Sequence, residues 1–203
     1  MPEVEFADVV RSRRMTRAFS GSPVARGVIE ECLGLAARSP SAGKTQGWNV
    51  VGMTGADTAV FWDAALPPAK RDGFAFPGLL DAPFVGVVTA DPREYVRRYS
   101  ETDKAHTGLG SGENAWTTPY WTVDASMATM TFLHALHDRG LGALFFAVAH
   151  EPDVRAALGI DPAVQVIGAV AAGEPAEGTP VHGRSAGRPR RRGDEVVRWV
   201  EER

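Results

Sequence analysis

The chain has 203 residues, of which 44% are hydrophobic and 23% charged, and its formal net charge is -3. This length and composition are typical of a single soluble globular domain and exclude a disordered or fibrous protein. A charge so close to neutral, with no long basic stripe on one helix, argues against nucleic acid as the main partner.

The N-terminal part of the chain predicts two helices, a loop and a strand. Phe6, Val9 and Val10 recur at helical spacing just before the stretch RSRRMTRAFS, residues 11–20. A second helix is expected over about 24–38, followed by a Pro- and Ser-containing loop and the strand WNVVGMT at 48–54. The arginines of RSRRMTRAFS therefore occupy a helix end or the turn after it.

The middle of the chain predicts one buried strand and a long irregular region. APFVGVVTA, residues 82–90, is apolar enough for the strand, whereas residues 91–121 are polar and rich in aromatic side chains. Long irregular stretches inside a compact domain usually form lids or binding regions. Residues 62–121 are therefore expected to be a lid or substrate region.

The clearest helical pattern lies in VDASMATMTFLHALHDRGLG, residues 123–142, with Thr122 or Asp124 as the expected N-cap and Gly140 as its end. A buried strand at 143–149, a short helix at 151–160 and another buried strand at 164–173 follow. Because strands and helices do not alternate strictly, the pattern predicts an α+β fold with a central sheet flanked by helices.

Sequence spacing indicates no metal site and no membrane segment. His134 and His137 can share a helix face, but no nearby cysteine or acid completes a metal-binding set. Cys32 lies in an apolar helical pattern and is expected to pack in the core. No window approaches the roughly 18 apolar residues of a membrane-spanning helix. We therefore expect a cytoplasmic protein with neither a metal nor a membrane partner.

Two separate basic clusters are the most informative feature, one at 11–20 and the other at 183–193. The rigid fork of donors on a guanidinium suits phosphate, and several guanidiniums together can neutralise a phosphomonoester. A solvated helix end and a solvated tail would explain the same residues, so composition alone leaves both interpretations open.

Four stretches, taken in order, resemble landmarks of the nitroreductase family of FMN-dependent enzymes. RRMTRAF at 13–19 resembles the opening R-R-S-x-R-x-F, and SPSAGKTQGW at 39–48 resembles P-S-x-x-N-x-Q-P-W. LHDRGLGALFF at 136–146 resembles the end of the long helix with its A-x-x-x-G-L-G turn, and GRPRRRGDEVV at 187–197 resembles K-x-R-x-P-L-x-E-V-V. The chain departs from these patterns mainly at Met15, where the family has Ser, and at Lys44, where Asn is common.

The resemblance implies a fold and an assembly. Residues 1–203 would form one FMN-binding domain with a mixed or antiparallel central sheet, ending in an extension over 183–203. Two chains would form an intertwined homodimer with FMN at the interface.

The resemblance also implies which residues surround the cofactor. Arg17 would stabilise negative charge near N1 and O2 of the reduced ring, and hydride would pass through flavin N5 without a catalytic side chain. The second-motif loop would come from the partner subunit. The implied FMN-binding residues are Arg13, Arg14, Met15, Arg17, Pro40, Ser41, Ala42, Lys44, Gln46, Phe145, Phe146, Ala147, Val148, Arg188 and Arg190.

The implied activity is transfer of hydride from NADH or NADPH to a nitroaromatic, quinone or enone. Two alternatives stay open: an offshoot that uses FMN for a biosynthetic dehydrogenation or consumes the flavin, and a flavin-binding module without turnover. Trp116, Tyr120 and Trp121 either line the acceptor pocket or anchor the lid to the core.

Overall fold

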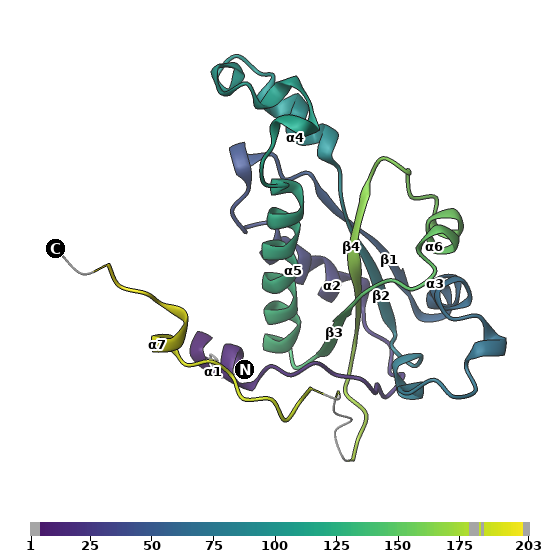
Figure 1. Ribbon diagram of the computed structural model, residues 1–203. Helices are drawn as coiled ribbons and strands as arrows, with labels where there is room; N and C mark the ends of the chain where they lie inside the picture. Colours follow the sequence, from purple (N-terminus) through teal and green to yellow (C-terminus); the bar gives the residue numbers. More distant parts are fainter. Residues whose placement is uncertain (1–4, 179–182, 184, 201–203) are drawn as a thin grey trace.

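Four strands form the sheet in the computed structural model of the chain, which describes residues 5–178, 183 and 185–200 (Figure 1). They are β1 (Trp48–Thr54), β2 (Phe84–Ala90), β3 (Gly142–Phe146) and β4 (Gln165–Gly173), in the spatial order β1-β2-β4-β3. All three neighbouring pairs are antiparallel. The expected α+β fold with a central antiparallel sheet is confirmed.

Helices cover both faces of the sheet. Helices α2 (Arg26–Ala36) and α5 (Tyr120–Asp138) pack together on one face, and α3 (Thr58–Ala65) and α6 (Glu151–Leu158) pack on the other (Figure 1). Helix α1 (Phe6–Ser12) lies near the C-terminal end of α5, and α4 (Pro92–Tyr99) lies near its N-terminal end. A short helix, α7 (Gly193–Val196), lies in the tail.

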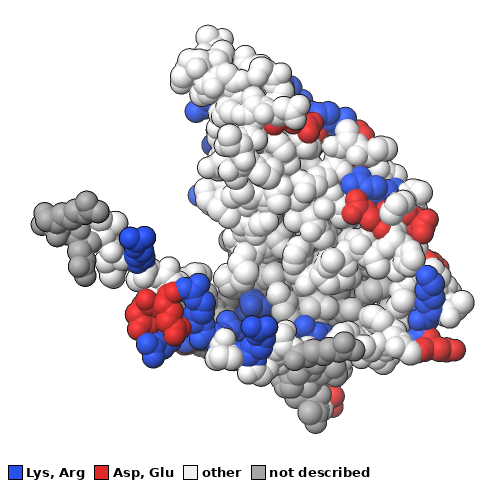
Figure 2. Space-filling model, viewed as in Figure 1, with Lys and Arg blue, Asp and Glu red and all other residues white. Residues whose placement is uncertain are grey.

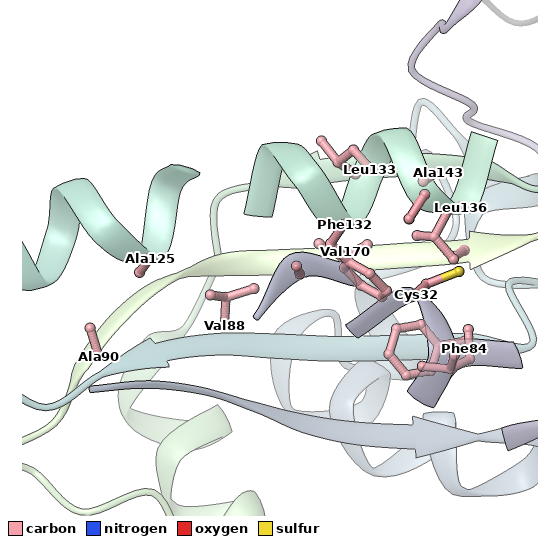
Figure 3. Close-up of a cluster of buried hydrophobic side chains, with 14 of the residues drawn as sticks. Cys32, Phe84, Val88, Ala90, Ala125, Phe132, Leu133, Leu136, Ala143 and Val170 are labelled. Atoms are coloured by element: carbon pink, nitrogen blue, oxygen red, sulfur yellow. The ribbon is translucent and has the colours of Figure 1, made fainter. Parts of the chain in front are cut away.

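The core follows from the alternation of side chains along β2, which is buried at all seven positions. Phe84 and Val88 point to the side of α5, where they meet Cys32 and Phe132 (Figure 3). The intervening Val85 and Val87 join the cluster beneath α3 and α6. Two covered faces require an apolar residue at every strand position, which explains the unbroken apolar run. Cys32 is fully buried, as expected, and burial raises the pKa of its thiol.

The prediction that residues 91–121 are irregular was wrong at the start of this range, where helix α4 forms. The Asp91 carboxylate accepts a hydrogen bond from the Arg93 backbone N–H at 2.9 Å, and Pro92 occupies the first helical position. Both are standard signals for the start of a helix. Helix α3 was also not expected. Region 62–121 includes β2, and its role as a lid or substrate region stays a prediction.

The expected cap of the long helix was also wrong. Helix α5 begins at Tyr120, directly after Pro119, so Thr122 and Asp124 lie inside it. Asp124 is 1% exposed, and its Oδ2 accepts hydrogen bonds from the Ala42 N–H at 2.9 Å and the Tyr95 hydroxyl at 2.8 Å. Aspartate often caps helices, but Asp124 here connects α5 by hydrogen bonds to the segments that carry Ala42 and Tyr95. Gly140 follows the helix in a left-handed conformation, as expected.

No helix within the described part of the chain is both long and apolar enough to span a membrane.

Candidate functional site

The arginine-rich motif is fixed against the edge of the sheet. After α1 the chain runs beside β3, where Met15 forms an isolated parallel bridge with Ala143 and the Thr16 N–H donates to the Ala143 carbonyl at 2.9 Å. At Gly142 a Cβ atom would lie only 2.8 Å from the Thr16 Cβ. Glycine at this position therefore lets the motif approach the strand, so the G-L-G turn helps to place the arginines.

The structure brings the two basic clusters to one cavity of about 760 Å³. Figure 2 shows Lys and Arg gathered near α1 and the tail, whereas much of the neighbouring surface is uncharged. The cavity is large enough for a small-molecule cofactor. Its lining residues are Arg13, Arg14, Met15, Arg17, Gly183, Ser185, Ala186, Gly187, Arg188 and Arg190.

Arg13 is the least compensated charge of this cavity. Its Nε and Nη1 are buried and have no hydrogen-bond partner among the described residues. Burial lowers the pKa of Arg13, and the nearby charges of Arg190 and Arg14 lower it further. Leaving a cation desolvated and unpaired is costly. A bound anion would remove that cost.

The neighbouring arginines are oriented by backbone carbonyls. Arg14 Nη1 donates to the carbonyls of Arg11 and Arg13, and Arg17 Nη1 donates to the Met15 carbonyl at 3.0 Å. The Arg17 guanidinium also lies over the Phe76 ring, 5.5 Å from its centroid. A guanidinium has five N–H donors, so these contacts hold each side chain in place and leave donors for a ligand.

A second cavity, of about 620 Å³, adjoins the first and shares Arg14, Met15 and Arg17 with it. Sequence reasoning missed the residues that only this cavity has, among them Ser12 and His137. His137 Nε2 lies 2.7 Å from Ser12 Oγ. The available signal was its position three residues after His134 and three residues before the G-L-G turn, but this pair of histidines was considered only for metal binding. The other residues of this cavity are Thr16, Ala18, Gly140, Leu141, Gly142, Pro175, Ala176 and Glu177.

The second-motif loop does not line either of these cavities. The Ala42 N–H donates a hydrogen bond to the Asp124 carboxylate, and the Ser41 hydroxyl accepts one from the Gln46 N–H at 2.8 Å. Lys44 and Gln46 have left-handed backbone conformations, with φ of 57° and 53°. Pro40 lines a separate open groove beside α5. Within one chain the loop is therefore apart from the arginines, and its contribution to a partner's site stays a prediction.

Residues 145–148 also lie outside both cavities. The Phe146 ring stacks on Trp62 with centroids 5.9 Å apart, and Phe145 packs into the cluster beneath α5. Phe145 and Phe146 thus pack β3 against the helices on opposite faces of the sheet. Ala147 is exposed and Val148 is half-buried, immediately after the strand. Contact between this segment and a flavin ring stays a prediction.

The three aromatic residues of the expected substrate region differ in exposure. Trp116 and Trp121 are buried and pack edge-on against Tyr95, and Trp116 Nε1 donates to the Leu109 carbonyl at 3.0 Å. Tyr120 is 43% exposed and lines a cavity of about 360 Å³ together with Trp116. The two tryptophans thus belong to the core cluster, Tyr120 is the accessible member of the set, and a role of the three residues in an acceptor pocket stays a prediction.

Within the described ranges, no group of three or more His, Cys, Asp or Glu side chains is arranged to hold a metal ion. The chemistry available at the arginine-lined cavities is therefore that of anion binding by fixed guanidiniums, with an imidazole and a hydroxyl beside them.

Comparison with known proteins gave a match to the model of the nitroreductase family over residues 10–174. No curated protein matches the chain.

The fold is similar to several solved structures. A candidate nitroreductase of Exiguobacterium sibiricum in complex with FMN has a TM-score of 0.73 at 14% identity, covering 98% of this chain and 99% of that one. A candidate NAD(P)H:FMN oxidoreductase of Staphylococcus epidermidis has a TM-score of 0.70 at 16% identity, covering 98% of both chains. An enone reductase of gut-bacterial fatty acid saturation has a TM-score of 0.71 at 21% identity, covering 92% of this chain and 96% of that one.

Proposed function

Because the chain belongs to the nitroreductase family, we propose that it is an FMN-dependent oxidoreductase that takes hydride from NADH or NADPH and reduces an oxidised organic acceptor. Nitroaromatics, quinones and enones are the acceptor classes. The observation that carries the proposal is the arginine-lined cavity, in which the half-buried Arg13 has two buried guanidinium nitrogens without a hydrogen-bond partner among the described residues. Such a site fits the terminal phosphate of FMN, since a dianion supplies acceptors for several guanidiniums at once.

The residues of this chain have three tasks in the proposed reaction. When bound, FMN supplies the hydride-transfer chemistry, so the protein has to bind it, orient it and adjust its electrostatics. Arg13, Arg14, Arg188 and Arg190 would neutralise the phosphate. Arg17, which the Met15 carbonyl and the Phe76 ring hold in place, would offer positive charge toward the ring.

Met15 affects the hydrogen bonds that the protein can offer the cofactor. With Met15 in place of serine, this position has no side-chain hydroxyl for the cofactor, and the chain relies more heavily on its guanidiniums.

The first test of the function uses colour and redox state. Purified protein should be yellow, or become yellow with FMN, and anaerobic addition of NADH or NADPH should bleach it rapidly, as followed by its visible absorbance. Protein that stays colourless after incubation with FMN would contradict the proposal. Bound FMN that neither nicotinamide reduces would favour the offshoot chemistry, and reduction without turnover of any acceptor would favour a binding module.

The proposed enzyme is a homodimer. An open apolar groove of about 790 Å³ lies beside α5 and is bordered by Phe6, Leu35, Pro40 and Met130. Three of these side chains, Phe6, Leu35 and Met130, are large, apolar and exposed, and contiguous exposed apolar surface is typical of an interaction site. In the tail, Trp199 is 80% exposed, as expected for an arm that packs on a second chain. Since Pro40 borders the groove, a dimer through it would bring the second-motif loop to the interface.

A charge in the groove should dissociate this dimer. In Leu35→Asp the new carboxylate would be buried unpaired on association, which costs several kcal/mol and should raise the dimer dissociation constant at least about 100-fold. Light scattering after size exclusion measures the mass. Val60→Asp is the matched control, because Val60 is 45% exposed and Leu35 48%, but Val60 lies on α3 at the opposite face of the sheet. Equal dimerisation of the two variants would contradict an interface in this groove.

A further inference from the structure

We propose that His137 is a ligand of the phosphate group and takes up a proton when a phosphomonoester dianion binds. This inference rests on the proposed function, in which that phosphomonoester is FMN. It adds a titrating imidazole to a phosphate site otherwise made of arginines, whose charge does not change near neutral pH.

The position of His137 is the first argument. It lies in the last turn of α5 and lines the cavity of about 620 Å³ together with Arg14 and Arg17. Both of those arginines also line the larger arginine cavity. The imidazole thus lines a cavity that shares Arg14 and Arg17 with the cavity proposed to bind phosphate.

The hydrogen bonds of Ser12 define the tautomer of the neutral ring. The Ser12 hydroxyl donates its one proton to the Asp8 carbonyl at 2.5 Å. At its 2.7 Å contact with His137 it must therefore accept, so Nε2 carries the proton and donates. Nδ1 is then the nitrogen with a lone pair, and it is the atom that gains the proton when the ring becomes charged.

The charges around the ring explain why binding and protonation are coupled. In the free protein, burial lowers the pKa of His137 and the charges of Arg13 and Arg14 lower it further, while Asp138 on the same helix opposes them. Arg17 and Glu177 line the same cavity, and His134 is affected by Arg13 in the same direction. The histidine is therefore mostly neutral at pH 7 before binding.

Binding of phosphate changes the charge around His137 from positive to negative. A phosphate dianion between Arg13, Arg14 and His137 neutralises the guanidiniums and attracts a proton to the ring. An opposite charge within about 4–6 Å shifts a pKa by roughly 1–3 units toward the charged form, so the pKa of His137 should rise above neutrality in the complex. A group whose pKa is higher in the bound state than in the free state takes up protons on binding.

His134 is a matched control on the same helix. Its pKa is lowered by burial and by Arg13, as for His137. Its ring, however, packs edge-on against Phe6 at a centroid distance of 6.1 Å, and it lines the apolar groove, not the arginine cavities. The two histidines therefore share an electrostatic environment in the free protein and differ in access to the proposed phosphate.

The test is isothermal titration calorimetry of the full-length apoprotein with FMN at pH 7 in buffers of different ionisation enthalpy, which counts protons taken up. We expect His137 to take up on the order of half a proton per FMN, partly offset by the roughly one tenth of a proton that a phosphate with a pKa near 6 releases when it binds as the dianion. Riboflavin, which lacks the phosphate, should give almost none. His137→Gln keeps a donor for Ser12 but cannot titrate, so its uptake should vanish, while His134→Gln should behave like the wild type.

The affinity gives a second readout. The FMN dissociation constant of His137→Gln should exceed that of the wild type by about tenfold at pH 6, the equivalent of one pKa unit, and the ratio should approach one as the pH rises above 8. Tight FMN binding by the wild type without proton uptake would overturn this inference but not the proposed function. The same holds if proton uptake is lost in His134→Gln and kept in His137→Gln. Absence of FMN binding at every pH would overturn the proposed function and this inference together. If His137→Gln does not fold, the comparison of FMN with riboflavin on the wild type together with proton uptake by His134→Gln can still contradict the inference.

Discussion

Arg13→Met is expected to weaken FMN binding by about 100-fold while leaving the free protein at least as stable as the wild type. The guanidinium has two buried nitrogen atoms, Nε and Nη1, without a partner in the described part of the chain, and hydrogen bonds to a charged ligand contribute about 1.5–3 kcal/mol each. Losing about 3 kcal/mol corresponds to about 100-fold in affinity. Methionine keeps the aliphatic stem and removes only the charged fork.

The stability of the free protein should respond in the opposite direction. The pKa of Arg13 is lowered by burial, so the charged form is disfavoured in the fold and its removal relieves a desolvation cost. Fluorescence titration with FMN and thermal unfolding without FMN measure the two effects.

Arg11→Met is the matched control for Arg13→Met. The Arg11 side chain is 77% exposed and pairs with Asp8 at 3.6 Å on the surface, so its loss should change neither the FMN affinity nor the stability appreciably. Equal FMN affinity of Arg13→Met and wild type would remove Arg13 from the site. A marked loss of stability in the free variant would make Arg13 a structural residue instead.

Asp124→Leu is expected to destabilise the fold by about 2–4 kcal/mol. The substitution leaves the Ala42 N–H and the Tyr95 hydroxyl buried without their acceptor, and each unsatisfied donor costs about 1–3 kcal/mol. Relief of the buried carboxylate, whose Oδ1 has no hydrogen-bond partner within the described ranges, offsets part of this cost. For a domain of this size, each kcal/mol corresponds to about 2–4 °C in Tm.

Two further variants test the network around Asp124. Asp124→Asn retains an acceptor oxygen and should lose much less stability than Asp124→Leu. Tyr95→Phe removes one donor, so the double variant Asp124→Leu with Tyr95→Phe should lose less than the sum of the single losses. Denaturant unfolding gives the coupling energy, and additivity of the two changes would show that the hydroxyl and the carboxylate act independently. The pKa of the Tyr95 hydroxyl is raised, first by burial and then by its bond to Asp124.

The same network bears on the second-motif loop. Arg98 Nε donates to the Gly43 carbonyl at 2.9 Å, so α4 contacts the loop directly as well as through Tyr95 and Asp124. Lys44 and Gln46 have left-handed conformations that cost energy for residues other than glycine, and such conformations persist where surrounding contacts enforce them. Hydrogen exchange should therefore become faster at residues 42–46 in Asp124→Leu, before global unfolding.

Strands were predictable from the sequence because their apolar runs are continuous. WNVVGMT was expected as a strand and forms β1 over the same residues, and β2 and β4 differ from their expected ranges by at most two residues. Helix α4 escaped prediction because its sequence, PREYVRRY, is mostly polar and has few buried positions. The role of Asp124 could not be predicted, since a buried acceptor inside α5 depends on where Ala42 and Tyr95 lie in three dimensions.

The candidate site was predictable in its composition but not in its electrostatics. The ordered motifs indicated that Arg13, Arg14 and Arg17 share a site with Arg188 and Arg190, and the structure places all five on one cavity. That two guanidinium nitrogens of Arg13 are buried without a partner among the described residues depends on packing that no local pattern encodes. His137 was examined only as a metal ligand, because its proximity to Arg14 arises from the contact between α1 and the end of α5.

The walls of the arginine-lined cavities come from four distant parts of the chain, and this bears on the order of folding. Residues 12–18 form one wall, His137 and the turn at 140–142 another, residues 175–177 a third, and residues 183, 185–188 and 190 the fourth. Contacts between residues so far apart in sequence form late, since their loop-closure entropy has to be overcome first. A chain still emerging from the ribosome cannot assemble this cavity until residue 190 has been synthesised. A ligand bound there would therefore stabilise only the finished fold, and cofactor supply would affect the lifetime of the native protein without guiding its early folding.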